Sequence, residues 1–139
     1  MSGELPSRRH FMVALFTPAV LRFASACDAW GHRAPAVHPE PRPGITASKV
    51  LKPDALRDDP DVIPVFDMVR QIPQVVDGIR CNCGCANEPG FYSLLSCFEG
   101  DGMARHCQVC LGQARLVSTL RAEGKSLKDI RQAIDDEFG

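Results

Sequence analysis

The sequence predicts a mostly α-helical protein, in which a small helical domain carries a cysteine-rich loop and ends in a C-terminal helical hairpin. Apolar residues recur at helical spacing in residues 62–69 and again in residues 127–138, a period typical of helices that bury one face. We find no convincing strand pattern and no internal repeat. A chain of 139 residues suits one small globular domain with appendages.

Residues 1–26 resemble a twin-arginine export signal. Arg8 and Arg9 precede an apolar run, residues 11–21, that is too short for a stable membrane anchor but suits the hydrophobic region of a signal. Residues 24–26, Ala-Ser-Ala, are typical of a cleavage site. We therefore expect an exported protein, periplasmic or anchored in the envelope of a bacterium. The alternative is a buried helix that begins with two arginines.

Cys27 directly follows the expected cleavage site, and two outcomes stay open for it. It is a candidate for lipidation, as in a bacterial lipoprotein, although Ala24 stands where such sites usually carry Leu or Val. Simple cleavage after Ala26 would instead leave an unpaired thiol in an oxidising compartment. The net charge of -1 offers no attraction to anionic lipids or nucleic acid. We therefore expect no nucleic-acid partner, and membrane association only through a lipid anchor.

Residues 27–59 are interpreted as a proline-rich linker. Six prolines lie in residues 28–60, and the stretch has few large apolar residues and no sustained period. His32 and His38 fall here, and we expect both to be solvated rather than to bind metal.

The cysteine-rich helical domain is expected to span residues 60–139. Asp59 and Pro60 mark its start, because an aspartate cap followed by proline is typical of the first helical turn. Gly124 and Ser126 separate the last two helices, since glycine commonly follows a helix end and serine commonly begins a helix. Those two helices should pack as an antiparallel hairpin. The expected helices are residues 60–72, with one more turn over 73–77, then residues 91–98, 103–122 and 127–138.

Six of the seven cysteines lie within residues 81–110. Thiols at this density are typical of disulfides or of a bound soft metal, because free thiolates are nucleophilic and oxidisable. The run Cys81-Asn82-Cys83-Gly84-Cys85 favours metal. Neighbouring cysteines in such a run form strained disulfides, whereas a loop containing glycine can wrap thiolates around a soft ion.

We expect this loop and the long helix to form one metal site. Cys107 and Cys110 share a helix face, His106 precedes Cys110 by four residues, and Cys97 could close the site from the short helix. The candidate metal ligands are therefore Cys81, Cys83, Cys85, Cys97, Cys107, Cys110 and His106. Because six cysteines exceed the four ligands of one zinc ion, copper(I) ranks above zinc as the metal.

Two other functions stay open. One is thiol-disulfide exchange through Cys107 and Cys110, but such motifs stand at a helix N-terminus, whereas a helix capped at Asp101 would place Cys107 in its second turn. The other is a disulfide-stapled module that binds a partner, because a core of about eighty residues is marginal without staples. Covalent haem attachment is not expected, since Leu111 rather than histidine follows Cys110.

Four ordered blocks carry a family resemblance. They are Cys81-Asn82-Cys83-Gly84-Cys85, residues 93–98, residues 106–110, and residues 123–126 with Ile130-Arg131 and Phe138-Gly139. Together they resemble the PCYCGC-motif proteins, a functionally uncharacterised bacterial family often found as lipoproteins. The chain carries Arg80 and Asn82 where the motif has proline and tyrosine, and it retains every cysteine. The resemblance covers about residues 60–139 and implies an exported protein with a cysteine-rich helical domain.

A fainter similarity is to the thiol-reductase component of cytochrome c maturation, through Cys107-x-x-Cys110 and Gly124-Lys125-Ser126. We expect instead an exported or surface-anchored protein that binds a soft metal and acts as a carrier, chaperone or buffer rather than as an enzyme. Its partners would be the metal ion and a metalloprotein or membrane-bound protein.

Overall fold

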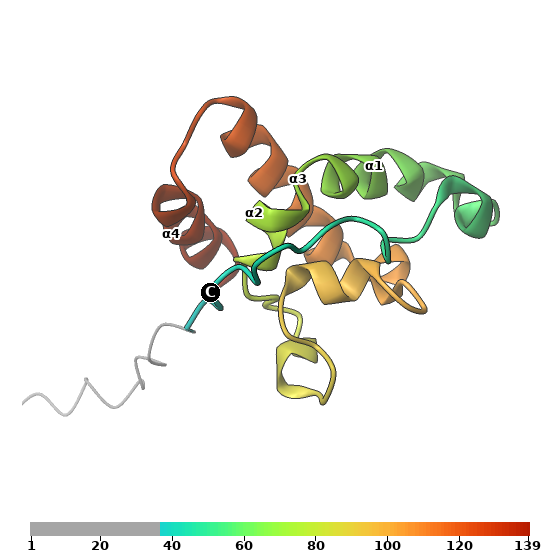
Figure 1. The fold of residues 1–139 in the computed structure, drawn as a ribbon, viewed down its shortest axis with the longest axis horizontal. Helices are drawn as coiled ribbons and strands as arrows, with labels where there is room; N and C mark the ends of the chain where they lie inside the picture. Colours follow the sequence, from blue (N-terminus) through green and yellow to red (C-terminus); the bar gives the residue numbers. More distant parts are fainter. Residues whose placement is uncertain (1–36) are drawn as a thin grey trace, which may run out of the picture. The chain divides into compact units, whose positions relative to one another are not determined.

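The structure is a computed structural model, and it describes residues 37–139. These residues are mostly helical and form no strand, with a single bridge between Val50 and Glu99, so the expected fold class is confirmed. None of their helices is long and apolar enough to cross a membrane. The expected export signal and Cys27 lie outside the described residues. The elements (Figure 1) are the 3-10 helices η1 (Pro53–Leu56), η2 (Pro60–Val62), η3 (Cys85–Asn87), η4 (Leu94–Phe98) and η5 (Met103–His106), and the α-helices α1 (Ile63–Gln71), α2 (Pro73–Asp77), α3 (Gln108–Ala122) and α4 (Leu127–Phe138).

The C-terminal hairpin is confirmed. Gly124 ends the α3 segment with a left-handed φ of 80°, and the Ser126 hydroxyl accepts a hydrogen bond of 3.2 Å from the Asp129 amide at the start of α4. Ile130 and Ile134 are completely buried where α4 packs on α3. This hairpin supplies a rigid support for the N-terminal end of α3.

Helix α1 packs against α3 on its other side. Proline at one of its first two positions is tolerated, because the first helical turn leaves its amide groups unpaired. Phe66 on α1 meets Phe98 of η4 edge to face, with ring centroids 4.7 Å apart. This contact joins the helical core to the short helix that carries Cys97.

The long helix expected over residues 103–122 is interrupted at Cys107. The chain forms η5, becomes extended at Cys107 with φ -119° and ψ 107°, and then enters α3. The Cys107 amide closes the 3-10 turn on the Ala104 carbonyl at 3.1 Å, and the Cys107 carbonyl accepts from the Leu111 amide at 3.1 Å to open α3. Cys107 therefore occupies the N-cap of α3 rather than the second turn of a longer helix.

Residues 38–59 differ from the linker that the sequence predicts over residues 27–59. Val50 is 2% exposed and Leu56 is completely buried in the core, and Figure 1 shows this part of the chain running across the helices. His38, expected to be solvated, has a side chain only 8% exposed and accepts a 2.9 Å hydrogen bond from the Arg80 amide. Proline-rich composition signalled an extended segment, but the few apolar residues in it are sufficient to dock it.

Candidate metal centre

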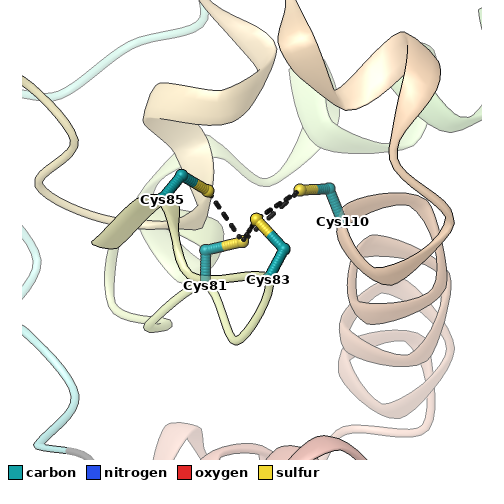
Figure 2. Close-up of side chains that lie close together, drawn as sticks. All are labelled: Cys81, Cys83, Cys85 and Cys110. Atoms are coloured by element: carbon teal, nitrogen blue, oxygen red, sulfur yellow. Dashed lines mark hydrogen bonds between the residues drawn. The ribbon is translucent and has the colours of Figure 1, made fainter. Parts of the chain in front are cut away.

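Four cysteine sulfurs meet between the loop after α2 and the first turn of α3. Figure 2 shows the side chains of Cys81, Cys83 and Cys85 from the loop and Cys110 from the helix pointing toward one another. Their sulfurs all lie within 4.8 Å of one another. The Cys81 sulfur is central, at 3.3 Å from Cys83, 3.4 Å from Cys110 and 3.5 Å from Cys85.

These distances suit metal ligation. A tetrahedral zinc site with metal–sulfur lengths of about 2.3 Å separates its sulfurs by about 3.8 Å, close to the separations found here. A disulfide would need about 2.05 Å, and all six cysteines of residues 37–139 are free thiols. The residues present therefore form a cluster that could hold a metal ion.

The remaining candidate ligands fall into three positions. Cys97 is completely buried on η4, and its sulfur lies 3.3 Å from that of Cys85. Cys107 is half-buried at the N-cap of α3. His106 is exposed at the end of η5 and is outside the four-sulfur set. The structure thus brings Cys97 to the cluster and leaves the His106 side chain exposed to solvent. Cys107 lies three residues before Cys110, the ligand candidate on α3.

The loop turns back on itself at Gly84. This residue has a left-handed φ of 98°, which residues with a Cβ adopt at a cost. The turn lets η3 begin directly at Cys85, so the sulfurs of Cys81 and Cys85 return to within 3.5 Å of each other. The role expected for Gly84 from the sequence, to let the backbone turn inward, agrees with this geometry.

Gln113 holds the loop against α3. Its side chain is completely buried, its Nε2 donates to the Arg80 carbonyl at 3.1 Å, and its Oε1 accepts from the Asn82 amide at 3.1 Å. Arg80 and Asn82 flank Cys81 in sequence. One amide side chain, one turn beyond Cys110 on the same helix, therefore fixes the backbone on both sides of the central sulfur.

A buried carboxylate anchors the segment before the loop. Asp77 at the end of α2 is completely buried and accepts from the Arg42 amide at 2.8 Å, from Arg42 Nη2 at 2.6 Å and from the Ser93 hydroxyl at 2.7 Å. Burial acts to raise the pKa of Asp77, but the hydrogen bonds from Arg42 and Ser93 outweigh it and hold the pKa below the usual 3.8. The Arg42 guanidinium also lies over the Tyr92 ring, 4.7 Å from its centroid.

The docked N-terminal segment completes the loop's support. His38 Nδ1 accepts a hydrogen bond from the Arg80 amide, and His38 Nε2 lies 3.1 Å from a carboxylate oxygen of Asp135 on α4. Arg131 of the same helix donates to the Gly78 carbonyl at 3.0 Å and to the Pro39 carbonyl at 2.7 Å. Helix α4 and the proline-rich segment therefore both contact the backbone just before Cys81.

The pKa values of the cluster thiols shift in opposite directions. The nearby thiols of Cys110 and Cys97 lower the pKa of Cys81 to about 2, against the opposing effect of burial. The contacts with Cys81 and Cys97, together with burial, raise the pKa of Cys110, and burial followed by the contact with Cys85 raises the pKa of Cys83 to about 12. The neighbouring thiols thus favour the ionised form of Cys81 and disfavour that of Cys83 and Cys110.

Cys107 has an environment of its own. Burial acts to raise the pKa of its thiol, but the nearby backbone amides of Cys110 and Val109, and the Cys110 thiol, lower it overall. Its place at the N-cap of a 15-residue helix favours negative charge. A Cys-x-x-Cys pair at a helix N-terminus is the arrangement found in thiol-disulfide exchange, so the sequence-based argument against that chemistry does not hold.

Sequence reasoning missed the residues that position the loop. Gln113 lies three residues after Cys110, and spacing of three places both on one helix face; a glutamine within that face was the available signal. Asp77 and Arg42 carried no comparable signal, because nothing in the sequence pairs residues 35 positions apart.

Comparison with known proteins adds one result. Residues 43–139, well over half of the chain, match the family described as "Protein of unknown function with PCYCGC motif". No curated protein matches the chain, and no solved structure matches it. The match begins within the docked proline-rich segment and includes every cysteine of the cluster. The chain belongs to the PCYCGC-motif family.

Proposed function

We propose that this protein binds a soft metal ion through its sulfur cluster and serves as a carrier, chaperone or buffer for it. The observation that carries the proposal is the set of four cysteine sulfurs within 4.8 Å of one another. Three of them, Cys81, Cys85 and Cys110, are buried, while Cys83 is partly exposed. An ion would enter from the side of Cys83 and be shielded from water once bound.

Copper(I) is the metal that we favour, and zinc is the alternative. Thiolates are the preferred ligands of both ions, but the cluster offers six sulfurs and no imidazole or carboxylate among the closest four. A structural zinc site needs four ligands. The six sulfurs exceed that number, and they include the buried Cys97. Such a surplus of soft ligands favours copper(I), which accepts few ligands per ion and can bind in multinuclear form.

We also propose that the protein acts outside the cytoplasm, exported and either free in the periplasm or anchored at the envelope through Cys27. The support is the arginine pair Arg8-Arg9 before an apolar run and the small residues before Cys27. Cell fractionation with intact-mass measurement tests this. We expect loss of at least the first 26 residues, and an uncleaved cytoplasmic product in the native host would refute it.

Ligand substitution tests the metal proposal. Cys83→Ser and Cys110→Ser lie in different segments, and both should weaken copper(I) binding in competition with a chromophoric chelator, because loop and helix share one site. Ser118→Ala on α3 is the matched control, since it removes a hydroxyl far along the helix from the cluster. His106→Ala should change affinity little. Unchanged affinity in both cysteine variants would refute a shared site.

Thiol-disulfide exchange is the second candidate, and the N-cap position of Cys107 favours it. In that mechanism the Cys107 thiolate attacks a partner's disulfide, the partner's leaving thiolate takes up a proton, and Cys110 then displaces the remaining partner sulfur to leave a Cys107–Cys110 disulfide. Cys110→Ser would trap mixed disulfides with other proteins, whereas Cys83→Ser would not. Absence of trapped adducts in the Cys110→Ser variant would remove this candidate.

A further inference from the structure

Five of the six sulfurs, all except that of Cys107, fall into two triangles that share one corner. The first consists of Cys81, Cys83 and Cys110, with sulfur–sulfur edges of 3.3, 3.4 and 3.6 Å. The second consists of Cys81, Cys85 and Cys97. The Cys85 sulfur is 3.5 Å from that of Cys81 and 3.3 Å from that of Cys97.

We propose that the cluster holds two copper(I) ions rather than one, with the Cys81 sulfur bridging them. This proposal rests on the proposed function and specifies its stoichiometry. Cys83 and Cys110 complete the position at the mouth of the site, and Cys85 and Cys97 complete the inner position. The Cys97 sulfur, outside the set of four that would hold a single ion, thereby becomes a ligand.

The dimensions of the first triangle fit a three-coordinate ion. The centre of the first triangle lies about 2.0 Å from each of its sulfurs, so an outward movement of about 0.3 Å per sulfur would give the roughly 2.3 Å lengths of metal–thiolate bonds. Copper(I) is a soft ion that thiolates select, and it accepts three ligands in a plane. Zinc would instead draw one tetrahedral set from the four central sulfurs and leave Cys97 unused.

The surroundings suit the charge and the order of the two positions. Thiolates in excess of the bound copper leave the cluster negative, and the N-terminal end of α3, which begins directly after Cys107, favours negative charge there. Cys85 and Cys97 are 5% and 0% exposed, while Cys83 is partly exposed. The inner ion would therefore be held more firmly, and the ion nearer Cys83 would exchange first. Each ligand binds as a thiolate, so the ligands that are still protonated release their protons on binding, and no electron transfer is involved.

Anaerobic titration with copper(I), supplied against a chromophoric competitor, tests the stoichiometry. All variants are made in the full chain carrying Cys27→Ser, so that the seventh cysteine cannot contribute. We expect two equivalents bound per chain, and one equivalent in Cys97→Ala. Leu95→Val is the matched control, because Leu95 is equally buried on the same 3-10 helix and loses a methylene rather than a sulfur. It should retain two.

A second measurement needs no variant. X-ray absorption of the loaded protein should show a short copper–copper scattering path, and zinc titration should end at one equivalent. One copper equivalent in the parent chain, unchanged in Cys97→Ala, would overturn the two-ion proposal while leaving soft-metal binding intact. Failure to bind any copper(I) or zinc would overturn both.

Discussion

Replacing Gln113 with methionine tests whether the loop's geometry depends on one buried amide. The substitution keeps the length of the side chain but removes the donor to the Arg80 carbonyl and the acceptor for the Asn82 amide, each 3.1 Å from Gln113. A buried backbone group that loses its partner costs about 1–3 kcal/mol. Because both groups lie in partly buried surroundings, we expect a total loss of about 2–3 kcal/mol in the free energy of unfolding.

Metal affinity should fall as well, because the two lost hydrogen bonds flank Cys81. Removal of groups that orient a metal ligand typically lowers affinity roughly 10- to 100-fold. Denaturant unfolding followed by circular dichroism measures the first effect, and chelator competition measures the second. Gln108→Met, at an exposed position of the same helix, is the control and should change neither. A Gln113→Met variant that matches the parent in both assays would refute the role assigned to this side chain.

Three further results are expected. Ile134→Ala should lower the free energy of unfolding by roughly 2–4 kcal/mol, because Ile134 is completely buried, while Lys128→Ala on the exposed face of α4 should change it little; equal unfolding curves would mean that Ile134 is not packed. The lowered pKa of Asp77 contributes stability that is complete above about pH 3.8 and is lost as the pH falls through the folded-state pKa. Asp77→Asn should abolish this contribution to the pH dependence of the unfolding free energy, measured from pH 5 downward, and the same pH dependence in parent and variant would contradict it. Gly84→Ala should lower the free energy of unfolding by about 1–2 kcal/mol through backbone strain alone, since no atom beyond the neighbouring residues lies within 4 Å of the added Cβ. Gly84→Asn should lower it by less, and a larger loss in Gly84→Asn than in Gly84→Ala would contradict the left-handed turn.

The helical hairpin was predictable from the sequence because its signals are local. Gly124, Ser126 and the apolar spacing of α4 each act within a few residues, and the structure has them as expected. The family relationship was also predictable from the sequence, since the cysteine spacings lie in short ordered blocks.

The break at Cys107 was not predictable in the same way. No proline or other strong helix breaker marks residue 107, yet the chain becomes extended there, with φ -119° and ψ 107°, before α3 begins. The break changes the chemistry expected of Cys107, because it places this cysteine at a helix N-terminus rather than inside a helix.

The docking of residues 38–59 depended on contacts distant in sequence. Composition identifies a proline-rich stretch as extended, but only the fold brings Arg42 to Asp77 and His38 to the Arg80 amide. The candidate metal site was therefore identifiable by its ligand types, whereas the hydrogen bonds that position its loop were not.

The most direct test of the central claim is the metal content of the protein as purified, measured by elemental analysis together with a count of reactive thiols. The protein should come from cells grown without added metal and should never meet a chelator or an oxidant. We predict a stoichiometric amount of copper or zinc, with the cluster thiols protected from a thiol reagent until the metal is removed. Six cluster cysteines paired in disulfides, in protein free of metal, would contradict the claim.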